Sequence, residues 1–268
     1  MKTSLYQEIH AFEDVHWWFV SRRLILRRIL DRFYLRPEAA KVLELGCGSG
    51  GNLKMLQKYG SLQAMELDDQ ARAWANARKL CQVEKGKLPH EMPFNDKFDL
   101  ICMLDLLEHI DDELATLRVA RERLKENGLL VITVPAFQFL WSRHDEVNLH
   151  IRRYHQKRLL EKCRQAGLRV EYSTYFNTFL FPLVAAVRLL NNLLGREAGS
   201  DIKLPPTAAN KFLTWLFSSE RFFLPRFSFP CGVSILLVAG RDEIPPSRRR
   251  QRHRSHRFWG KLRFFCRR

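Results

Sequence analysis

Short apolar runs alternate with helical patterns along the first two thirds of the chain. An apolar run bounded by glycine, proline or polar residues is typical of a buried strand. Such runs cover 41–45, 62–67, 81–84, 98–104, 129–134 and 168–175. The segments between them carry apolar residues at helical spacing, as at Leu114, Leu117 and Leu124. This alternation predicts an α/β fold built on a mostly parallel sheet.

One further apolar strand, 232–239, follows only after some 55 residues. An interval of that length is too long for a bare loop in a compact domain. One helical face within it carries four apolar residues, namely Leu183, Val187, Leu190 and Leu194. We therefore predict a helical insertion at 176–230, placed before a last core strand at 231–243.

The run 41–45 ends in a glycine-rich turn. Gly46, Gly48 and Gly51 have the spacing of a dinucleotide-binding loop, in which glycine lets the backbone turn sharply and approach a ligand. Glu44 lies two positions before the first glycine, where a carboxylate would repel a pyrophosphate and attract a cationic amino group. The pattern therefore favours S-adenosylmethionine over a nicotinamide dinucleotide.

Two segments resemble motifs of one enzyme family. Val-Leu-Glu-Leu-Gly-Cys-Gly-Ser-Gly, at 42–50, matches the first motif of class I S-adenosylmethionine-dependent methyltransferases, and Leu-Glu-His-Ile, at 107–110, matches a second. The similarity covers 38–175 and a last strand near 231–240. It implies a Rossmann-like, seven-stranded, mostly parallel sheet whose last strand is antiparallel. It also implies an enzyme that takes its methyl group from S-adenosylmethionine.

The resemblance implies a set of cofactor-binding residues. They are Glu44, Gly46, Cys47, Gly48, Gly50, Asn52, Glu66, Leu67, Leu88, Leu104 and Asp105. Glu66, 20 positions beyond Gly46, matches the family's acid that accepts hydrogen bonds from both ribose hydroxyls. Lys87 stands where relatives often carry an acid for the adenine amino group. We therefore expect backbone or apolar contacts to adenine, from Leu88 and its neighbours.

A polar segment after the strand at 129–134 holds the candidate catalytic residues. Methyl transfer to oxygen or nitrogen requires alignment and often a base for the acceptor's proton, and histidine titrates in a suitable range. We predict that His144 or His150 is this base and that Asp145 orients it, with His109 beside the methyl group. Two alternatives stay open: the polar segment can simply anchor the next helix, and His109 can brace its own loop.

Residues 4–35 carry an interrupted apolar stripe and are predicted to form a helix. Its centre, His-Trp-Trp-Phe at 16–19, is unusually aromatic. These rings can pack the helix against the sheet. Alternatively, 1–37 can form a helical lid over the cofactor, with Arg22 or Arg23 near the methionine carboxylate.

The positive charge is concentrated near the end of the chain. The formal net charge is +16, and 244–268 contains ten lysines and arginines and no acid. We expect this tail to be disordered and to attract acidic lipids or nucleic-acid phosphates. The insertion at 176–230 also mixes aromatic and basic residues, which suits a membrane interface or a cap packed on the core. We recognise no nucleic-acid-binding module, so a membrane is the favoured partner.

The six cysteines are scattered and include no Cys-x-x-Cys pair. We expect reduced thiols in a cytoplasmic protein, without disulfides and without a metal site. No amino-terminal segment resembles a signal peptide, and the longest apolar run, 179–187, falls short of the roughly 20 residues of a spanning helix. Peripheral binding at the inner face of the membrane is a further hypothesis.

The sequence thus predicts a methyltransferase core at 38–175 that acts on oxygen or nitrogen of a small or lipid-linked acceptor at a membrane surface. One alternative is an RNA or protein methyltransferase that uses the basic tail to hold the polymer. Another is a membrane-associated scaffold without turnover, which the complete glycine loop disfavours.

Overall fold

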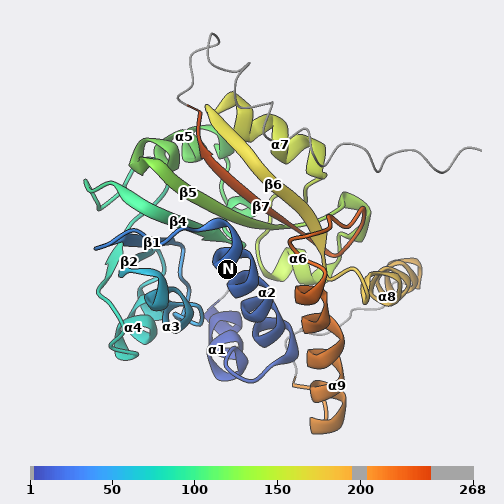
Figure 1. Ribbon diagram of the computed structural model, residues 1–268. Helices are drawn as coiled ribbons and strands as arrows, with labels where there is room; N and C mark the ends of the chain where they lie inside the picture. Colours follow the sequence, from blue (N-terminus) through green and yellow to red (C-terminus); the bar gives the residue numbers. More distant parts are fainter. Residues whose placement is uncertain (1–2, 195–203, 243–268) are drawn as a thin grey trace, which may run out of the picture.

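The computed structural model describes residues 3–194 and 204–242. Within them, seven strands form one sheet in the order β3-β2-β1-β4-β5-β7-β6 (Figure 1). The strands are β1 (Lys41–Leu45), β2 (Ser61–Glu66), β3 (Val83–Lys85), β4 (Phe98–Leu104), β5 (Leu124–Pro135), β6 (Leu168–Phe176) and β7 (Ser234–Arg241). The predicted basic tail, 244–268, lies outside the described residues.

All neighbouring strands run parallel except those that pair with β7. That strand lies between β5 and β6 and is antiparallel to both. The predicted α/β fold, with a mostly parallel sheet and an antiparallel last strand, is confirmed.

The described ranges contain nine α-helices and four 3₁₀ helices, of which α1 and α2 precede the first strand. The α-helices are α1 (Thr3–Phe12), α2 (Trp17–Phe33), α3 (Leu53–Leu56), α4 (Asp69–Ala77), α5 (Glu113–Arg123), α6 (Arg143–Val147), α7 (Gln156–Gln165), α8 (Phe181–Leu193) and α9 (Thr207–Ser218). The 3₁₀ helices are η1 (Gln57–Tyr59), η2 (Leu107–His109), η3 (Gln138–Leu140) and η4 (Ser219–Phe222).

The sheet has a separate apolar core on each face. Side chains alternate along a strand, so that Val42 packs with α2, α3 and α9, whereas its neighbour Leu43 packs with α5 and α7. Figure 1 shows the two groups of helices on opposite sides of the sheet. A strand buried on both faces reads as a continuous apolar run, which is why β1 and β4 were predictable.

Some predicted boundaries were wrong. Leu124, which continues the helical spacing of Leu114 and Leu117, lies outside the helix: α5 ends at Arg123, because Leu124 is fully buried and pairs with Phe98 as the first residue of β5. The third strand, predicted at 81–84, is β3 and begins two residues later.

The amino-terminal segment is two helices and not the single helix predicted at 4–35. The break falls at 13–16, where the side chain of Glu13 turns inward and contacts Ser49 and Arg78. His16 then caps α2, since its side chain accepts a hydrogen bond from the backbone N–H of Trp18.

The insertion at 176–230 contains α8, α9 and η4, as the helical prediction required. Glu220 is fully buried and attaches the insertion to the end of β6, because its carboxylate accepts hydrogen bonds from the backbone N–H groups of Asn177, Thr178 and Phe179. Burial raises the pKa of Glu220 to about 7, although these three donors act in the opposite direction.

The insertion also contacts the amino-terminal helices directly. The Asn210 side chain on α9 accepts a hydrogen bond from Trp17 N (2.9 Å) and donates one to Val15 O (2.9 Å). Ser21 Oγ donates to Thr214 O at 3.1 Å. Helices α2 and α9 therefore pack side by side as one layer on the same face of the sheet (Figure 1).

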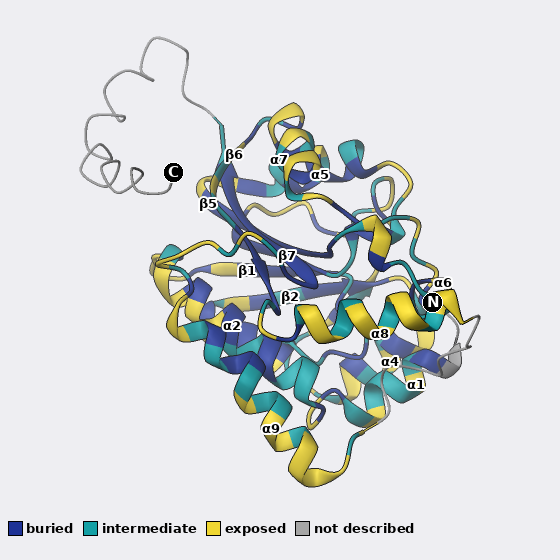
Figure 2. Ribbon diagram, turned by 90° about the vertical axis from the view of Figure 1, so that its right-hand side faces the viewer, coloured by how far each residue is buried: buried dark blue, intermediate teal, exposed yellow. Residues whose placement is uncertain are grey.

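The outer surface of the insertion is apolar. Every residue of α8 is at least partly exposed, and α8 and α9 show long exposed stretches in Figure 2. The most exposed large apolar residues of the insertion are Leu183, Leu193, Leu194, Phe212, Trp215, Phe222 and Phe227. None of the helices in the described ranges has the length and hydropathy that a membrane-spanning helix needs.

Candidate active site

A cavity of about 520 Å³ lies at the carboxyl ends of the parallel strands. Its lining comes from the loops after β1, β4, β5 and β6, from the start of β7, and from α1, α2, α8 and α9. Open α/β sheets bind ligands at this edge. The volume is within the range of about 300–1,000 Å³ typical of small-molecule sites.

The loop after β1 depends on its glycines. Gly46 and Gly48 adopt positive φ angles of 70° and 55°, which L-residues with a side chain rarely adopt. A Cβ atom on Gly51 would lie 2.1 Å from Glu13 Oε2, so this position leaves no room for a side chain. The loop can therefore bring its backbone N–H groups close to a ligand.

Glu66 holds the glycine loop from the end of β2. Its Oε2 accepts a hydrogen bond from Gly48 N (2.8 Å), and its Oε1 accepts from Asp68 N (2.9 Å) and from the Tyr6 hydroxyl (3.4 Å). A carboxylate has about four acceptor sites, so Glu66 retains one that these three donors do not use, and its contact with the ribose stays a prediction. Tyr6 was not predicted; burial and the charge of Glu66 raise its pKa well above the usual range.

Glu44 lies behind the loop and is fully buried. Its Oε1 accepts a hydrogen bond from Asn52 Nδ2 at 2.9 Å, while Oε2 has no partner among the described residues. Burial raises the pKa of Glu44 to about 8, against the opposing effects of Asn52 and the Arg22 charge. An unpartnered buried carboxylate oxygen fits a cationic ligand group that arrives from outside the chain.

The predicted cofactor residues divide into two groups. Those that line the cavity are Gly46, Cys47, Gly48, Asn52, Leu104 and Asp105. Those that lie outside the lining are Glu44, Gly50, Glu66, Leu67 and Leu88. Glu44 and Glu66 accept hydrogen bonds from Asn52 and Gly48, which line the cavity. Leu88 is buried in the core on the face of the sheet that α5 and α7 cover.

Asp105 follows β4 and forms an ion pair with Arg22 of α2. Its Oδ1 also accepts a hydrogen bond from the Thr133 hydroxyl at 2.8 Å. Arg22 is buried, and burial lowers its pKa to about 10. Arg23 donates to the backbone oxygen of Glu13. The role predicted for either arginine, contact with the methionine carboxylate, stays a prediction.

Asp145 is the centre of a buried charged group. It accepts two hydrogen bonds from Arg153, through Nε (2.8 Å) and Nη2 (3.0 Å), and its Oδ1 lies 2.8 Å from His150 Nδ1. It also accepts from Ser142 N, which closes a capping box at the start of α6. Burial alone would raise the pKa of Asp145, but the His150 and Arg153 contacts hold it well below its usual range.

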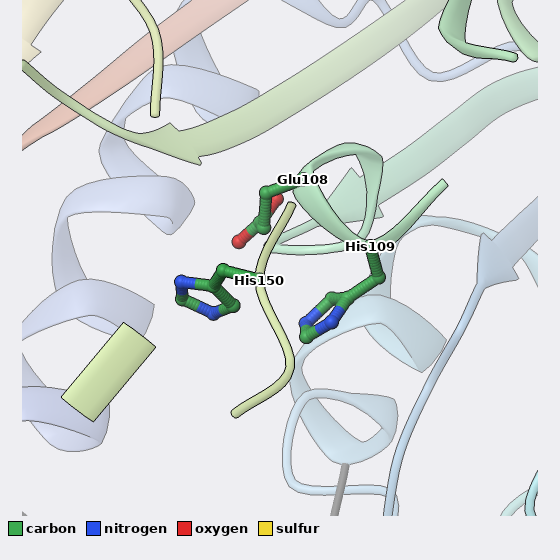
Figure 3. Close-up of side chains that lie close together, drawn as sticks. All are labelled: Glu108, His109 and His150. Carbon is green, nitrogen blue, oxygen red and sulfur yellow. The ribbon is translucent and has the colours of Figure 1, made fainter. Parts of the chain in front are cut away.

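The structure brings the predicted residues His109, Asp145 and His150 together. The rings of His109 and His150 lie 4.8 Å apart, and Glu108 lies beside them (Figure 3). Burial and the His150 charge lower the pKa of His109 to about 3. Burial raises the pKa of Glu108 to about 8, and neither carboxylate oxygen has a hydrogen-bond partner in the described part of the chain.

His144 also lines the cavity, with its ring 6.2 Å from that of His150. The other end of the polar segment anchors α7, as the alternative interpretation proposed. The Tyr154 hydroxyl donates to Glu113 Oε2 at 2.7 Å, and Arg152 pairs with the same carboxylate. The anchoring interpretation therefore holds for Arg152 and Tyr154, and the catalytic role of His144 or His150 stays a prediction.

The aromatic segment of α2 both packs on α9 and lines the cavity, and its role as a lid over the cofactor stays a prediction. Trp17, Trp18 and Phe19 line the cavity, and the two tryptophan rings also pack on Phe217 of α9. The sequence did not reveal Glu13, whose Oε1 accepts from Ser49 Oγ at 2.8 Å. Its signal was only indirect: the glycine at Gly51, which leaves space for that carboxylate.

Comparison with known proteins agrees with this geometry. The family described as a methyltransferase domain matches residues 17–173, which is more than half of the chain. The chain belongs to this family. The predictions of a class I methyltransferase enzyme and of S-adenosylmethionine as its cofactor are confirmed.

Two curated relatives illustrate the similarity of this methyltransferase. It is 26% identical over 149 residues to the ubiquinone biosynthesis O-methyltransferase of Haemophilus ducreyi, a match that covers 47% of this chain and 63% of the relative. It is 26% identical over 157 residues to a probable S-adenosylmethionine-dependent methyltransferase of Mycobacterium tuberculosis, covering 57% of this chain and 56% of the relative. The chain thus spans less than two thirds of either relative.

Solved structures share the fold. A chain from the complex between the Haloferax volcanii Trm112 methyltransferase activator and a putative methyltransferase superposes with a TM-score of 0.58 at 18% identity, covering 90% of this chain and 96% of that one. A putative methyltransferase from Bacillus halodurans gives 0.55 at 18% identity, covering 81% and 98%. At such identities the likeness concerns the fold alone.

Proposed function

We propose that this methyltransferase methylates an oxygen or nitrogen atom of a small or lipid-linked acceptor at a membrane surface. One observation carries the proposal: a single cavity joins the glycine loop and the histidines to the apolar helix α8. Leu183, Val184 and Val187 line the cavity, and Leu183 is 60% exposed, so the cavity wall continues into the outer apolar surface.

The residues around the glycine loop fit S-adenosylmethionine. When bound, the cofactor supplies an electrophilic methyl group on a positively charged sulfur. Gly46 and Gly48 allow close approach of the backbone, and Glu66 offers its remaining acceptor site to ribose. We expect Asn52, which lines the cavity, and the buried, unpartnered oxygen of Glu44 behind it to bind the amino group of the methionine part.

His150 is the best-oriented candidate base. Asp145 holds its Nδ1, which leaves Nε2 as the nitrogen that can take a proton from the acceptor. Because Arg153 and Ser142 fix Asp145 in turn, the imidazole has little freedom to rotate. His144, in the same cavity wall, is the second candidate.

Oxygen is the favoured acceptor atom. The relative from Haemophilus ducreyi is named as an O-methyltransferase, which supports the same atom here. Methyl transfer to a hydroxyl releases a proton, and a histidine held by a carboxylate suits that need.

The insertion supports a lipid-linked acceptor. Its exposed apolar residues include side chains of α8, α9 and η4, and Arg221 stacks over the ring of Phe222. Apolar rings beside basic side chains suit the boundary between lipid headgroups and acyl chains. An acceptor anchored in that layer would reach the cavity along α8.

The test is a methylation assay with S-adenosylmethionine labelled on its methyl group. The purified full chain is incubated with total lipid, RNA and protein fractions. We expect label in the lipid fraction or in a small extracted molecule. Label in RNA or protein would replace this proposal with polymer methylation, and no label with intact cofactor binding would support a scaffold.

Membrane binding is tested separately with vesicles that contain phosphatidylglycerol. Replacing Leu190 and Leu193 by aspartate should abolish co-flotation, because both leucines are exposed on α8. Leu35→Asp is the matched control, since Leu35 is 91% exposed outside the insertion. Equal flotation of all three proteins would contradict the membrane part of the proposal.

A further inference from the structure

We propose that Glu108, His109 and His150 bind a divalent transition-metal ion in the wall of the cavity. Each residue offers one ligand atom, and the three atoms lie within 4.8 Å of one another. Figure 3 shows the carboxylate and the two imidazole rings gathered around a common space. Bonds of about 2.0–2.2 Å from nitrogen and oxygen to one ion require only a small further approach of these side chains.

Glu108 is the observation that points to a ligand. Its side chain is fully buried, yet neither oxygen has a hydrogen-bond partner among the described residues. The nearby carboxylates are satisfied: Asp105 pairs with Arg22, and Asp145 pairs with Arg153. A buried carboxylate without donors is costly, so a group from outside the chain is its natural partner.

The two histidines are already oriented for metal binding. Asp145 contacts His150 Nδ1 at 2.8 Å, which leaves Nε2 as the ligand nitrogen. The backbone of Leu149 lies beside the His109 ring and acts to raise its pKa, against the larger effect of burial. Histidine ligands in metal sites commonly donate their other N–H to a carboxylate or a backbone carbonyl, and these outer contacts fix the ring orientation.

The ligand set indicates the class of ion. Two imidazoles and one carboxylate suit Zn²⁺, Fe²⁺ or Mn²⁺ better than Mg²⁺ or Ca²⁺, which prefer oxygen ligands. The group contains no cysteine, so the cysteine spacing in the sequence gave no sign of it. Three protein ligands leave coordination positions open, and all three residues line the cavity.

The role of the ion rests on the proposed function. An ion at this place would polarise an acceptor hydroxyl and direct its oxygen towards the methyl group. His150 would then be a ligand, and the acceptor's proton would pass to His144 or to water. The existence of the site is independent of that role.

The experiment uses the full chain, stripped with a chelator and dialysed, with Zn²⁺ as the probe. Calorimetry measures the zinc affinity, and elemental analysis measures the zinc retained after gel filtration. Glu108→Gln removes one ligand charge at nearly constant volume, and His109→Gln is the second variant. The matched control replaces His90 and Glu91 by glutamine, because this adjacent pair of the same residue types is exposed.

We expect one retained ion per chain in the unmodified protein and in the control, and at least about tenfold weaker zinc binding in both site variants. Zinc binding that is equal in all four proteins, or absent from the unmodified protein, would overturn the proposal. Circular dichroism and S-adenosylmethionine binding are measured on the same samples. Retained zinc without cofactor binding would refute the proposed function and leave the metal site standing.

Discussion

The glycine loop and the polar segment 142–153 line the same cavity but hold their polar groups in different ways. The glycine loop is held by backbone geometry and by single hydrogen bonds to carboxylates, as between Gly48 N and Glu66. The polar segment is held by a buried ion pair, Asp145 with Arg153. The carboxylates that contact the glycine loop keep acceptor sites that a ligand can use. A buried ion pair instead fixes the position of a side chain, and both charges lose their hydration.

This difference predicts that the polar segment contributes more to the free energy of unfolding than the glycine loop does. Replacing Arg153 by methionine should lower the free energy of unfolding by about 3–5 kcal/mol, because Asp145 would stay buried without its bidentate partner. Urea titration followed by circular dichroism measures the change. Arg169→Met is the matched control: its pair with Glu171 is partly exposed and should contribute less than about 1 kcal/mol. Equal losses in the two variants would remove the proposed difference.

The glycine loop should instead dominate cofactor affinity. Glu66→Ala removes the acceptor for Gly48 N and the remaining site for ribose, so S-adenosylmethionine should bind about 100-fold more weakly, or about 2.7 kcal/mol. Calorimetry on the folded protein gives the value, and Glu91→Ala, at an exposed position, serves as the control. An affinity within a factor of two of the unmodified protein would show that Glu66 has no part in binding.

The buried carboxylate of Glu44 predicts that part of the stability near the glycine loop depends on pH. Its pKa is raised from 4.5 to about 8, so the folded chain binds more protons than the unfolded chain between these values. The stabilisation from Glu44 is therefore complete below about pH 4.5 and is lost as pH rises towards 8. Glu44→Gln should remove this decline, which we expect to amount to roughly 1–3 kcal/mol. Urea titrations of cofactor-free protein from pH 5 to 8 make the test; parallel curves for the two proteins would contradict it.

The smallest effect is expected at the contact between α9 and the amino-terminal helices. Asn210→Ala removes hydrogen bonds with Trp17 N and Val15 O and should cost about 1–2 kcal/mol of unfolding free energy. It should also raise the hydrogen-exchange rate of the amides at the start of α2. Lys211→Ala, exposed on the same helix, is the control and should change neither quantity.

The parts of the site that the sequence predicted are local. β1, the glycine turn and Glu66 follow from residues close together in the chain, because a strand, a turn and a strand-end acid need few distant partners. Helix caps are local in the same sense: the side chains of Asp68 and Asp112 accept hydrogen bonds from backbone N–H groups three positions further along the chain.

The parts that escaped prediction depend on distant contacts. The break between α1 and α2 follows from Glu13 reaching Ser49, 36 positions away. Leu124 continued the helical pattern of α5, but pairing with Phe98 placed it in β5. The Glu108 carboxylate has no ion-pair partner among the described residues because Arg22 and Arg153 pair with Asp105 and Asp145 instead. The spacing of residues in the sequence does not predict these pairings.

The hydrogen bonds from Asn210 to the start of α2 connect α9 with the wall of the cavity. The backbone N–H of Trp17 donates to the Asn210 side chain of α9, and the Trp17 side chain also lines the cavity. Energetic coupling between two sites is reciprocal. If a ligand bound at α9 changed the affinity for S-adenosylmethionine, the cofactor would change the affinity of α9 for that ligand by the same factor.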